Sequence, residues 1–280
     1  VLNVHQDWSD DLLRSYFRRI AAWNPFFRKL APRNPVENSG LNFIRSMRHP
    51  ANVCGGDWSE LPWFEAEELL FNGIAVYSDD TKAGKVPSLL TAEAARGFDH
   101  DDFEKFVLSG NVLMSGEAFF ILQQKRLTGA LNLTASPLPR DAQCGEFLSD
   151  DPFNGDDAGK FYYFPQTDAS AYVFDLGGSG ARELGYAARH LQRDSFGCSS
   201  FLLEHGNGKR LAVCGLPGRF NRQLSEAKHR QLLKLADWIQ HGRSPVIPRT
   251  HHAQLLIPLK QSGKYYGTVV LNNSIDAFTP

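Results

Sequence analysis

Hydrophobic and polar positions along this chain form short apolar runs that alternate with helical patterns. A β-rich run at residues 74–77 follows an apolar helical segment that ends at Asn72-Gly73. A second apolar run, 111–114, leads into a new helical pattern. Strands that alternate with helices predict a parallel sheet with helices on its faces. The sequence therefore predicts an α/β, Rossmann-like fold.

The same periodicities predict the other elements. Helical spacing of apolar residues, with capping residues at the starts, predicts helices over residues 8–30, 64–71, 89–98, 99–108, 117–126, 182–192 and 225–241. Apolar and β-branched runs predict strands over residues 41–44, 74–77, 111–114, 130–134, 171–176, 200–204, 210–214, 252–260 and 265–272. Glycine-containing turns at 205–208 and 262–263 indicate that the strands on either side of each form hairpins.

The elements divide the chain into three parts. Residues 1–40 are expected to be a helical segment that ends an upstream domain. Residues 41–243 are expected to form the α/β domain, with a loop-rich insertion near 136–165, where Pro, Asp and Gly are frequent. Residues 244–280 are expected to be β-rich. Because two strands alone are not stable in water, the last hairpin must pair with another sheet.

Composition narrows the function classes. The chain has 280 residues, 42% of them hydrophobic, and a formal net charge of −1. Without a basic block, nucleic acid is not an expected partner. No apolar run reaches the length of a membrane span, so no membrane partner is expected either. Without a visible signal peptide, we expect a soluble protein of the cytoplasm or periplasm. Because the chain starts at Val1, we expect a mature product or a piece of a longer protein.

Neither a metal nor a cofactor is expected from the motifs. The four cysteines form no CxxC pair, and buried free thiols are the expected state. The glycines of residues 177–180 lack the lysine and hydroxyl of a P-loop. The acidic residues at 150–157 lack the ligand spacing of an EF-hand, so a solvated loop is expected there. No GxSxG elbow is present, and Cys198 leads into a β-run rather than a helix.

Two groups of residues are candidates for a binding or catalytic site. Asp57, Trp58 and Trp63 lie in one loop, where an indole face beside a carboxylate suits a sugar ring. The tryptophans are also consistent with anchors at an interface or with plugs over a core. Asp79 and Asp80 follow the strand at 74–77, at the end where α/β sheets keep their ligand crevice. Such a pair could bind a metal or act as acid and base, and the simpler alternative is a solvated turn.

Residues 70–80 (LFNGIAVYSDD) and 108–118 (LSGNVLMSGEA) resemble the middle domain of β-galactosidase-like glycoside hydrolases related to family 42. Residues 263–276 are similar to the final strands of that group. The resemblance implies a glutamine-amidotransferase-like α/β domain, associated with subunit contacts, followed by a β-rich part. It also implies an upstream catalytic barrel, carbohydrate as the substrate class and a homo-oligomer.

The chain departs from that family in two respects. The catalytic (β/α)8 barrel does not fit into the residues before Leu41, so its glutamates cannot be assigned to any residue here. The Cys-His-Glu set of amidotransferases is not evident either, as for a fold that lacks the activity. We expect a non-catalytic, oligomerisation or accessory portion of a glycoside hydrolase that by itself lacks the catalytic residues. The alternatives are a self-contained glycoside hydrolase that uses Asp57, Asp79 or Asp80, and a stand-alone sugar-binding module.

Overall fold

The structure, a computed structural model, describes most of the chain from Glu37 onward and part of the N-terminal segment. The described residues are 9–11, 14–15, 17–18, 21–22, 25, 37–44, 64–139, 144–163, 171–189, 195–220, 225–248 and 254–272. Asp57, Trp58 and Trp63 lie outside them, as does much of the predicted helix 8–30. The residues described between Asp10 and Pro25 are helical and exposed.

An eleven-stranded sheet forms the centre of the molecule. Its strands are β2 (Leu41–Phe43), β3 (Val76–Tyr77), β4 (Ser88–Leu90), β5 (Val112–Ser115), β6 (Thr134–Pro137), β7 (Cys144–Leu148), β8 (Phe161–Tyr163), β9 (Tyr172–Asp175), β10 (Arg182–Arg189), β11 (Ser195–Glu204) and β12 (Arg210–Cys214). The strand order is β3-β2-β4-β5-β12-β11-β10-β7-β8, and β9 links β6 to β11 beside this path.

The sheet is mixed, so the prediction of a parallel sheet is only partly correct. The strands from β3 to β12 are parallel. From β12 onward, through β11, β10, β7 and β8, neighbouring strands are antiparallel. The change occurs at the predicted hairpin between β11 and β12, because a short turn can join only antiparallel strands.

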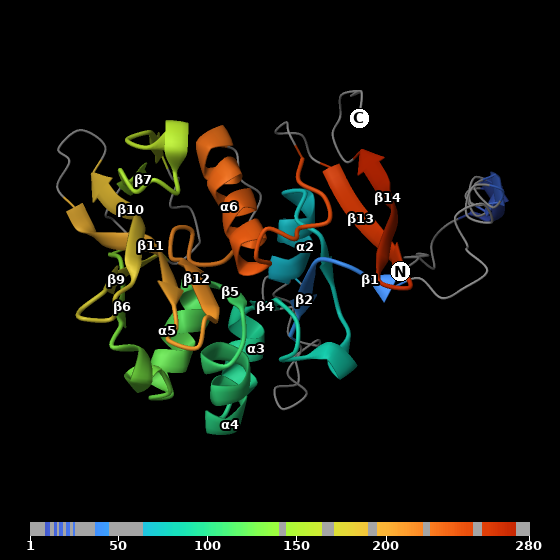
Figure 1. Cartoon of the computed structure of the whole chain (residues 1–280). Helices are drawn as coiled ribbons and strands as arrows, with labels where there is room; N and C mark the ends of the chain where they lie inside the picture. The colour runs from blue at the N-terminus through green and yellow to red at the C-terminus, as the bar shows by residue number, and fades with distance from the viewer. Residues whose placement is uncertain are drawn as a thin grey trace.

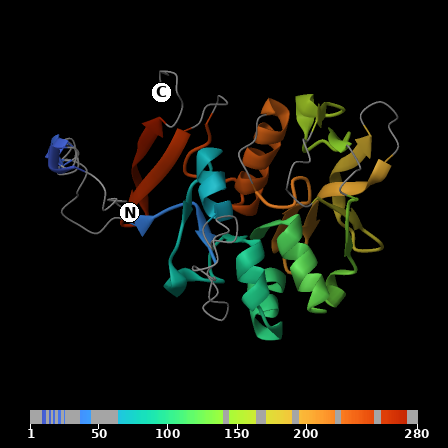
Figure 2. The same cartoon turned by 180° about the vertical axis from the view of Figure 1, so that it is seen from behind.

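Helices cover both faces of the parallel half. They are α2 (Phe64–Phe71), α3 (Ala92–Gly97), α4 (His100–Phe103), α5 (Gly116–Gln124) and α6 (Glu226–Ile239). Val112 and Met114 of β5 belong to one hydrophobic cluster, with side chains of α3, α4 and α5, whereas Leu113 belongs to a second one, with α2 and α6. Figures 1 and 2 show the same division, with α2 and α6 on one side of the strands and α3 to α5 on the other. Side chains alternate across a strand, so β5 contributes to both cores.

Two local predictions differ from the structure. Residues 182–192 were expected to be helical, but β10 occupies most of them, hydrogen-bonded to β11 on one side and to β7 on the other. The prediction is wrong because pairing with distant strands decides the conformation here, and local spacing does not report it. The segment expected to be a loop-rich insertion near 136–165 contributes β6, β7 and β8 to the sheet, with loops between them.

A second, smaller sheet contains β1 (Glu37–Asn38), β13 (Gln254–Gln261) and β14 (Lys264–Asn272), in the order β1-β13-β14. It confirms the predicted C-terminal hairpin and supplies the additional strand that the hairpin needs. That strand, β1, comes from the segment 1–40, which was expected to be helical. Leu256 of β13 is buried, and β13 contacts α2, so the small sheet packs against one edge of the α/β unit (Figure 1).

Gly116 stands where α5 begins and where backbone segments approach closely. A Cβ atom at this position would lie 2.6 Å from the Cα of Gly215 and 3.2 Å from the carbonyl oxygen of Cys214. We expect Gly116→Ala to lower the free energy of unfolding by about 1–3 kcal/mol, because backbone atoms must shift to admit the methyl group. Urea denaturation measures this change. Gly129→Ala is the matched control, since a Cβ there meets no atom within 4 Å; equal losses in the two variants would contradict the prediction.

Candidate functional site at the carboxyl edge of the sheet

The order of the parallel strands defines one point where ligands bind in open α/β sheets. β2 lies between β3 and β4, so the chain goes outward to β3 and then returns past β2 to β4. In open α/β sheets, a crevice forms at the carboxyl ends of the two neighbouring strands between which the direction of the connections reverses. Asn42 of β2 is buried there; its side-chain amide donates to the carbonyl of Asp79 and accepts from the Asp79 backbone N–H. The chain after β3 is thereby tied to β2.

Asp79 and Asp80 stand at this edge, as predicted, but in different surroundings. The Asp79 carboxylate accepts hydrogen bonds from the backbone N–H and the hydroxyl of Thr81, at 3.0 and 2.6 Å, and lies 3.6 Å from Lys82 Nζ. The Thr81 bonds, with the Lys82 charge, lower the pKa of Asp79. Asp80 is exposed in the single 3-10 turn Asp80–Lys82. Asp79 therefore caps its own turn, and the role of the pair in a site remains a prediction.

A carboxyl group that sequence reasoning missed lies deeper at the same edge. Glu65, in the first turn of α2, is 3% exposed. Its Oε1 accepts hydrogen bonds from Ser115 Oγ at 3.0 Å and from the backbone N–H of Ala92 at 3.4 Å. Its Oε2 is inaccessible to solvent and has no hydrogen-bond partner in the described part of the chain. Glu65 thus connects α2 to the residues that follow β4 and β5.

Burial changes the protonation of Glu65. Removal from water raises its pKa from 4.5 to about 8, although the charge of Arg219 and the Ser115 hydrogen bond act in the opposite direction. Glu65 therefore carries a proton at neutral pH. A buried acid with a perturbed pKa at the ligand edge of an α/β sheet is the kind of group from which active sites are built, although structural networks also produce such groups.

An arginine fork binds Glu117, two residues after Ser115 in the chain. Arg219, in the segment that follows β12, donates through Nε and Nη2 to the two carboxylate oxygens of Glu117, at 2.6 and 2.8 Å. The backbone N–H of Glu117 also donates to the carbonyl of Gly218 at 2.8 Å. Arg96 approaches the same carboxylate at 3.6 Å. We call Glu65, Ser115, Glu117 and Arg219 the carboxyl-edge cluster.

Ser115 occupies the turn between a strand and a helix, where some hydrolases place a nucleophile. Its backbone is extended, with φ −79° and ψ 159°, and its hydroxyl accepts from the Ala118 N–H at 3.3 Å as the N-cap of α5. The hydroxyl proton is donated to Glu65. The strained turn of a nucleophile elbow is therefore not present at Ser115, and the serine serves as a helix cap.

A buried ion pair, with its hydrogen-bond partners, joins the antiparallel half of the sheet to α6. Lys228 Nζ of α6 lies 2.7 Å from Glu146 Oε2 of β7, and both side chains are at most 2% exposed. Ser199 and Ser200 of β11 donate to Glu146 Oε1 at 2.5 and 2.9 Å, and the Tyr162 hydroxyl of β8 donates to Oε2. This Glu146–Lys228 network is enclosed and its carboxylate is fully hydrogen-bonded, as expected of a structural ion pair.

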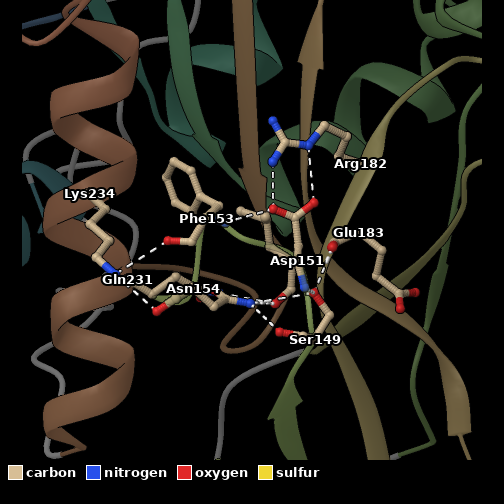
Figure 3. Close-up of polar contacts among 9 residues, drawn as sticks. Ser149, Asp151, Phe153, Asn154, Arg182, Glu183, Gln231 and Lys234 are labelled. Carbon is tan, nitrogen blue, oxygen red and sulfur yellow. Dashed lines mark hydrogen bonds and ion pairs between the residues drawn. The ribbon is translucent and has the colours of Figure 1, made fainter. Parts of the chain in front are cut away.

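The acidic residues at 150–157 belong to a loop that is tied down by cations. Asp151 accepts two hydrogen bonds from Arg182 of β10, at 3.0 and 2.5 Å (Figure 3). Asp157 pairs with Arg230 of α6 and with Lys160, and its pKa is well below the usual range because of the Arg230 hydrogen bonds. The expectation of a solvated loop is therefore wrong for these two residues, since arginine side chains from β10 and α6 reach their carboxylates.

The centre of the same loop is fixed by Asn154. This buried side chain donates to the carbonyls of Ser149 and Leu184, and its oxygen accepts from Gln231 of α6 (Figure 3). Lys234 donates to the carbonyls of Phe153 and Asn154. Across the described ranges, no group of three His, Cys, Asp or Glu side chains is arranged to hold a metal ion.

Two further findings concern ligands and membranes. A small pocket lies between Ile74 and the last turn of α6, beside residues 244–247, and it is lined without any carboxylate or indole. It therefore does not bring together the predicted site residues.

None of the helices described is both long enough and apolar enough to cross a bilayer.

No protein-family model matches the sequence, and no curated protein matches it. Among solved structures, the chain is similar to a cold-adapted β-galactosidase from Rahnella sp. R3, with a TM-score of 0.49 and 13% identity over 91% of this chain and 43% of that one. It is also similar to a β-galactosidase from Bacillus circulans sp. alkalophilus, with a TM-score of 0.36 and 10% identity over 66% of this chain and 30% of that one. The chain spans less than half the length of either.

Proposed function

We propose that this chain is a non-catalytic accessory and oligomerisation portion of a β-galactosidase-like glycoside hydrolase. The proposal starts from the resemblance of residues 70–80 and 108–118 to the middle domain of that group. In the fold, these two stretches contain β3 and β5 with the turns that follow them. The carboxyl edge of the sheet is therefore the place at which the proposal has to be examined.

The observation that carries the proposal is that three polar side chains at this edge are held by structural partners. Asp79 caps its own turn, Ser115 caps α5, and Glu117 is held by Arg219. Glycoside hydrolysis needs two carboxyl groups that face each other across a bound sugar. Within the described ranges, these side chains are committed to holding the fold together, which supports an accessory role.

The proposal includes the architecture and the partners. We assign residues 41–243 to a glutamine-amidotransferase-like domain, and the order β3-β2-β4-β5-β12 of its parallel strands is consistent with that assignment. Carbohydrate would then be bound by a catalytic barrel upstream of this chain, with a second copy of the chain as the partner in subunit contacts. Trp58 and Trp63 are the residues we propose to close a sugar site on a neighbouring chain.

The test is an activity assay combined with a mass measurement on the 280-residue chain. We expect no hydrolysis of an aryl β-galactoside above the uncatalysed rate, because at the described edge Asp79 is held by Thr81 and Glu117 by Arg219. Sedimentation velocity is expected to show an oligomer. An active β-galactosidase assayed in parallel shows that the conditions support hydrolysis.

Three outcomes distinguish the proposal from its alternatives. Hydrolysis that disappears in Asp79→Asn or Asp80→Asn would establish a self-contained hydrolase instead. A monomer that binds oligosaccharides in calorimetry, and loses the heat in Trp58→Ala, would establish a sugar-binding module. An inert, monomeric chain that binds no sugar would remove the oligomerisation role.

A further inference from the structure

Glu65 lies at a junction of three elements, and its two carboxyl oxygens have unequal surroundings. Oε1 accepts both observed hydrogen bonds, from Ser115 Oγ and from the Ala92 N–H, so it serves α5 and α3 together. Oε2 has no hydrogen-bond partner in the described chain. Since Oε1 is the acceptor, the proton of the neutral acid belongs on Oε2. Loss of that proton would leave a negative oxygen in a buried place without a donor, which is costly.

The charged groups around this junction come from every element that packs there. α3 contributes Glu93 and Arg96, α5 begins with Glu117, and the segment after β12 contributes Arg219. Among these groups, Arg219 exerts the largest charge effect on Glu65, and it favours the ionised form; Glu117 opposes ionisation. Ser115 is bonded to Glu65, and Glu117, two residues further along the chain, holds Arg219, so the cation that could compensate a charge on Glu65 belongs to the same cluster.

Arg219 is suited to serve two carboxylates. A guanidinium group has five N–H donors in a planar fork, and it binds a carboxylate through two of them. In the present arrangement Nε and Nη2 are directed at Glu117. A charge on Glu65 would compete with Glu117 for these donors, because the attraction between opposite charges is stronger in a buried site than in a partly exposed one.

We propose that a proton on Glu65 decides which carboxylate holds Arg219. While Glu65 is protonated, Arg219 pairs with Glu117 and fastens the segment 215–220 to the start of α5. When Glu65 loses the proton, Arg219 moves to Glu65 and fastens the same segment to the start of α2. The carboxyl edge of the sheet thus contains a pH-dependent switch between two ion pairs, independent of the function proposed above.

The protonation of Glu65 can be followed directly by NMR, through the side-chain carboxyl carbon of a carbon-13-labelled sample. We expect a midpoint near pH 8 in the unaltered protein. Glu117→Gln releases Arg219 and should lower the midpoint by roughly one pH unit or more, whereas Arg219→Met should raise it by a similar amount. Glu67→Gln, at an exposed position of the same helix, is the matched control and should leave the midpoint unchanged.

The movement of Arg219 can be followed separately, through its own NMR resonance. The Nε resonance of Arg219 should shift at the same midpoint as Glu65, and Glu65→Gln, which keeps the shape of the side chain but cannot ionise, should abolish that shift. A midpoint below pH 6, a midpoint that Glu117→Gln does not move, or an Nε shift that persists in Glu65→Gln would overturn the proposal. Because Glu117→Gln is a conservative change, the test does not depend on whether Arg219→Met folds.

The pH dependence of stability provides an independent check that the pKa of Glu65 is raised in the folded protein. The pKa of Glu65 is raised from 4.5 in the unfolded chain to about 8 in the fold, so its contribution is fully present below pH 4.5 and is lost as the pH rises to about 8. Between pH 4.5 and about pH 8, the urea midpoint of the unaltered protein should therefore fall relative to that of Glu65→Gln. Above about pH 8, the difference between the two urea midpoints should stay constant. Parallel profiles of the two proteins would contradict a raised pKa.

Discussion

Replacing Lys228 with methionine is expected to lower the free energy of unfolding by about 3–5 kcal/mol, because a buried charge loses its partner. Lys228 is 2% exposed and Glu146 is fully buried, with 2.7 Å between Nζ and Oε2. Without the ammonium group, the carboxylate keeps hydrogen bonds from Ser199, Ser200 and Tyr162 but has no compensating charge. Urea or guanidinium denaturation at neutral pH measures the loss.

A double variant separates the cost of the lone charge from the loss of side-chain packing. Lys228→Met combined with Glu146→Gln removes both charges and retains an amide oxygen that can accept from Ser199 and Ser200. We expect the double variant to recover more than half of the loss, because neutral groups are cheaper to bury than an unpaired ion. If Lys228→Met alone costs less than about 1 kcal/mol, the ion pair contributes little and our assignment is wrong.

Truncating Phe119 is expected to have a comparable effect, about 3–5 kcal/mol for Phe119→Ala. Phe119 of α5 is fully buried and packs edge-to-face against Phe174 of β9 and Phe201 of β11, with ring centroids 5.5 and 6.1 Å apart. Phe174 and Phe201 contact each other at 5.0 Å, so the three rings join a helix to two strands of the sheet. Removal of the ring leaves a cavity that these strands cannot close without moving.

Phe120 provides a matched control on the same helix. It is only partly buried and lies over the ring of Tyr172 at 5.0 Å. Phe120→Ala should therefore cost clearly less, about 1–2 kcal/mol, since surrounding water can occupy part of the vacated space. Phe119→Leu should fall between the two. Equal losses at positions 119 and 120 would show that the aromatic cluster is not the packing centre we describe.

The elements that the sequence predicts correctly are those whose determinants lie within a few residues. β5 is a continuous apolar run, as expected for a strand buried on both faces. α6 begins where the Ser225 side chain accepts from the Lys228 N–H, and it has a regular apolar stripe. The hairpin of β11 and β12 follows from its glycine-rich turn. Each of these signals is local, and local signals are what a single sequence reports.

Elements that depend on distant pairing were not predictable in the same way. β4 occupies Ser88–Leu90, where the pattern indicated only a helix over 89–98; the helix starts at Ala92 instead. The strand exists because β2 and β5 pair with it on either side. β10 was mistaken for a helix for the same reason. The antiparallel half of the sheet could not be distinguished from helices and loops because its hydrogen-bond partners are far apart in sequence.

The carboxyl-edge cluster shows that site residues are likewise hard to predict from the sequence when their contacts are distant along the chain. Sequence position correctly located Asp79 and Asp80 at the end of a strand of the parallel sheet, because that inference needs only strand order. Glu65 looked like an ordinary acid in the first turn of a helix, favoured by the helix dipole. Its contact with Ser115 spans fifty positions and has no local signature. Buried carboxyl groups of this kind are rare and become visible only when the packing is known.

The pairing of β1 with β13 has a consequence for how this unit connects to anything beyond it. Glu37 lies opposite Lys260, next to the turn of the β13–β14 hairpin, whereas Asn272 lies opposite Gln254 at the other end of that hairpin (Figure 1). A neighbouring domain attached before Glu37 and one attached after Asn272 would therefore emerge at opposite ends of the small sheet. The pairing of β1 with β13 closes a loop of about 220 residues. It is therefore expected to form late in folding, after the large sheet has brought the two ends of that loop together.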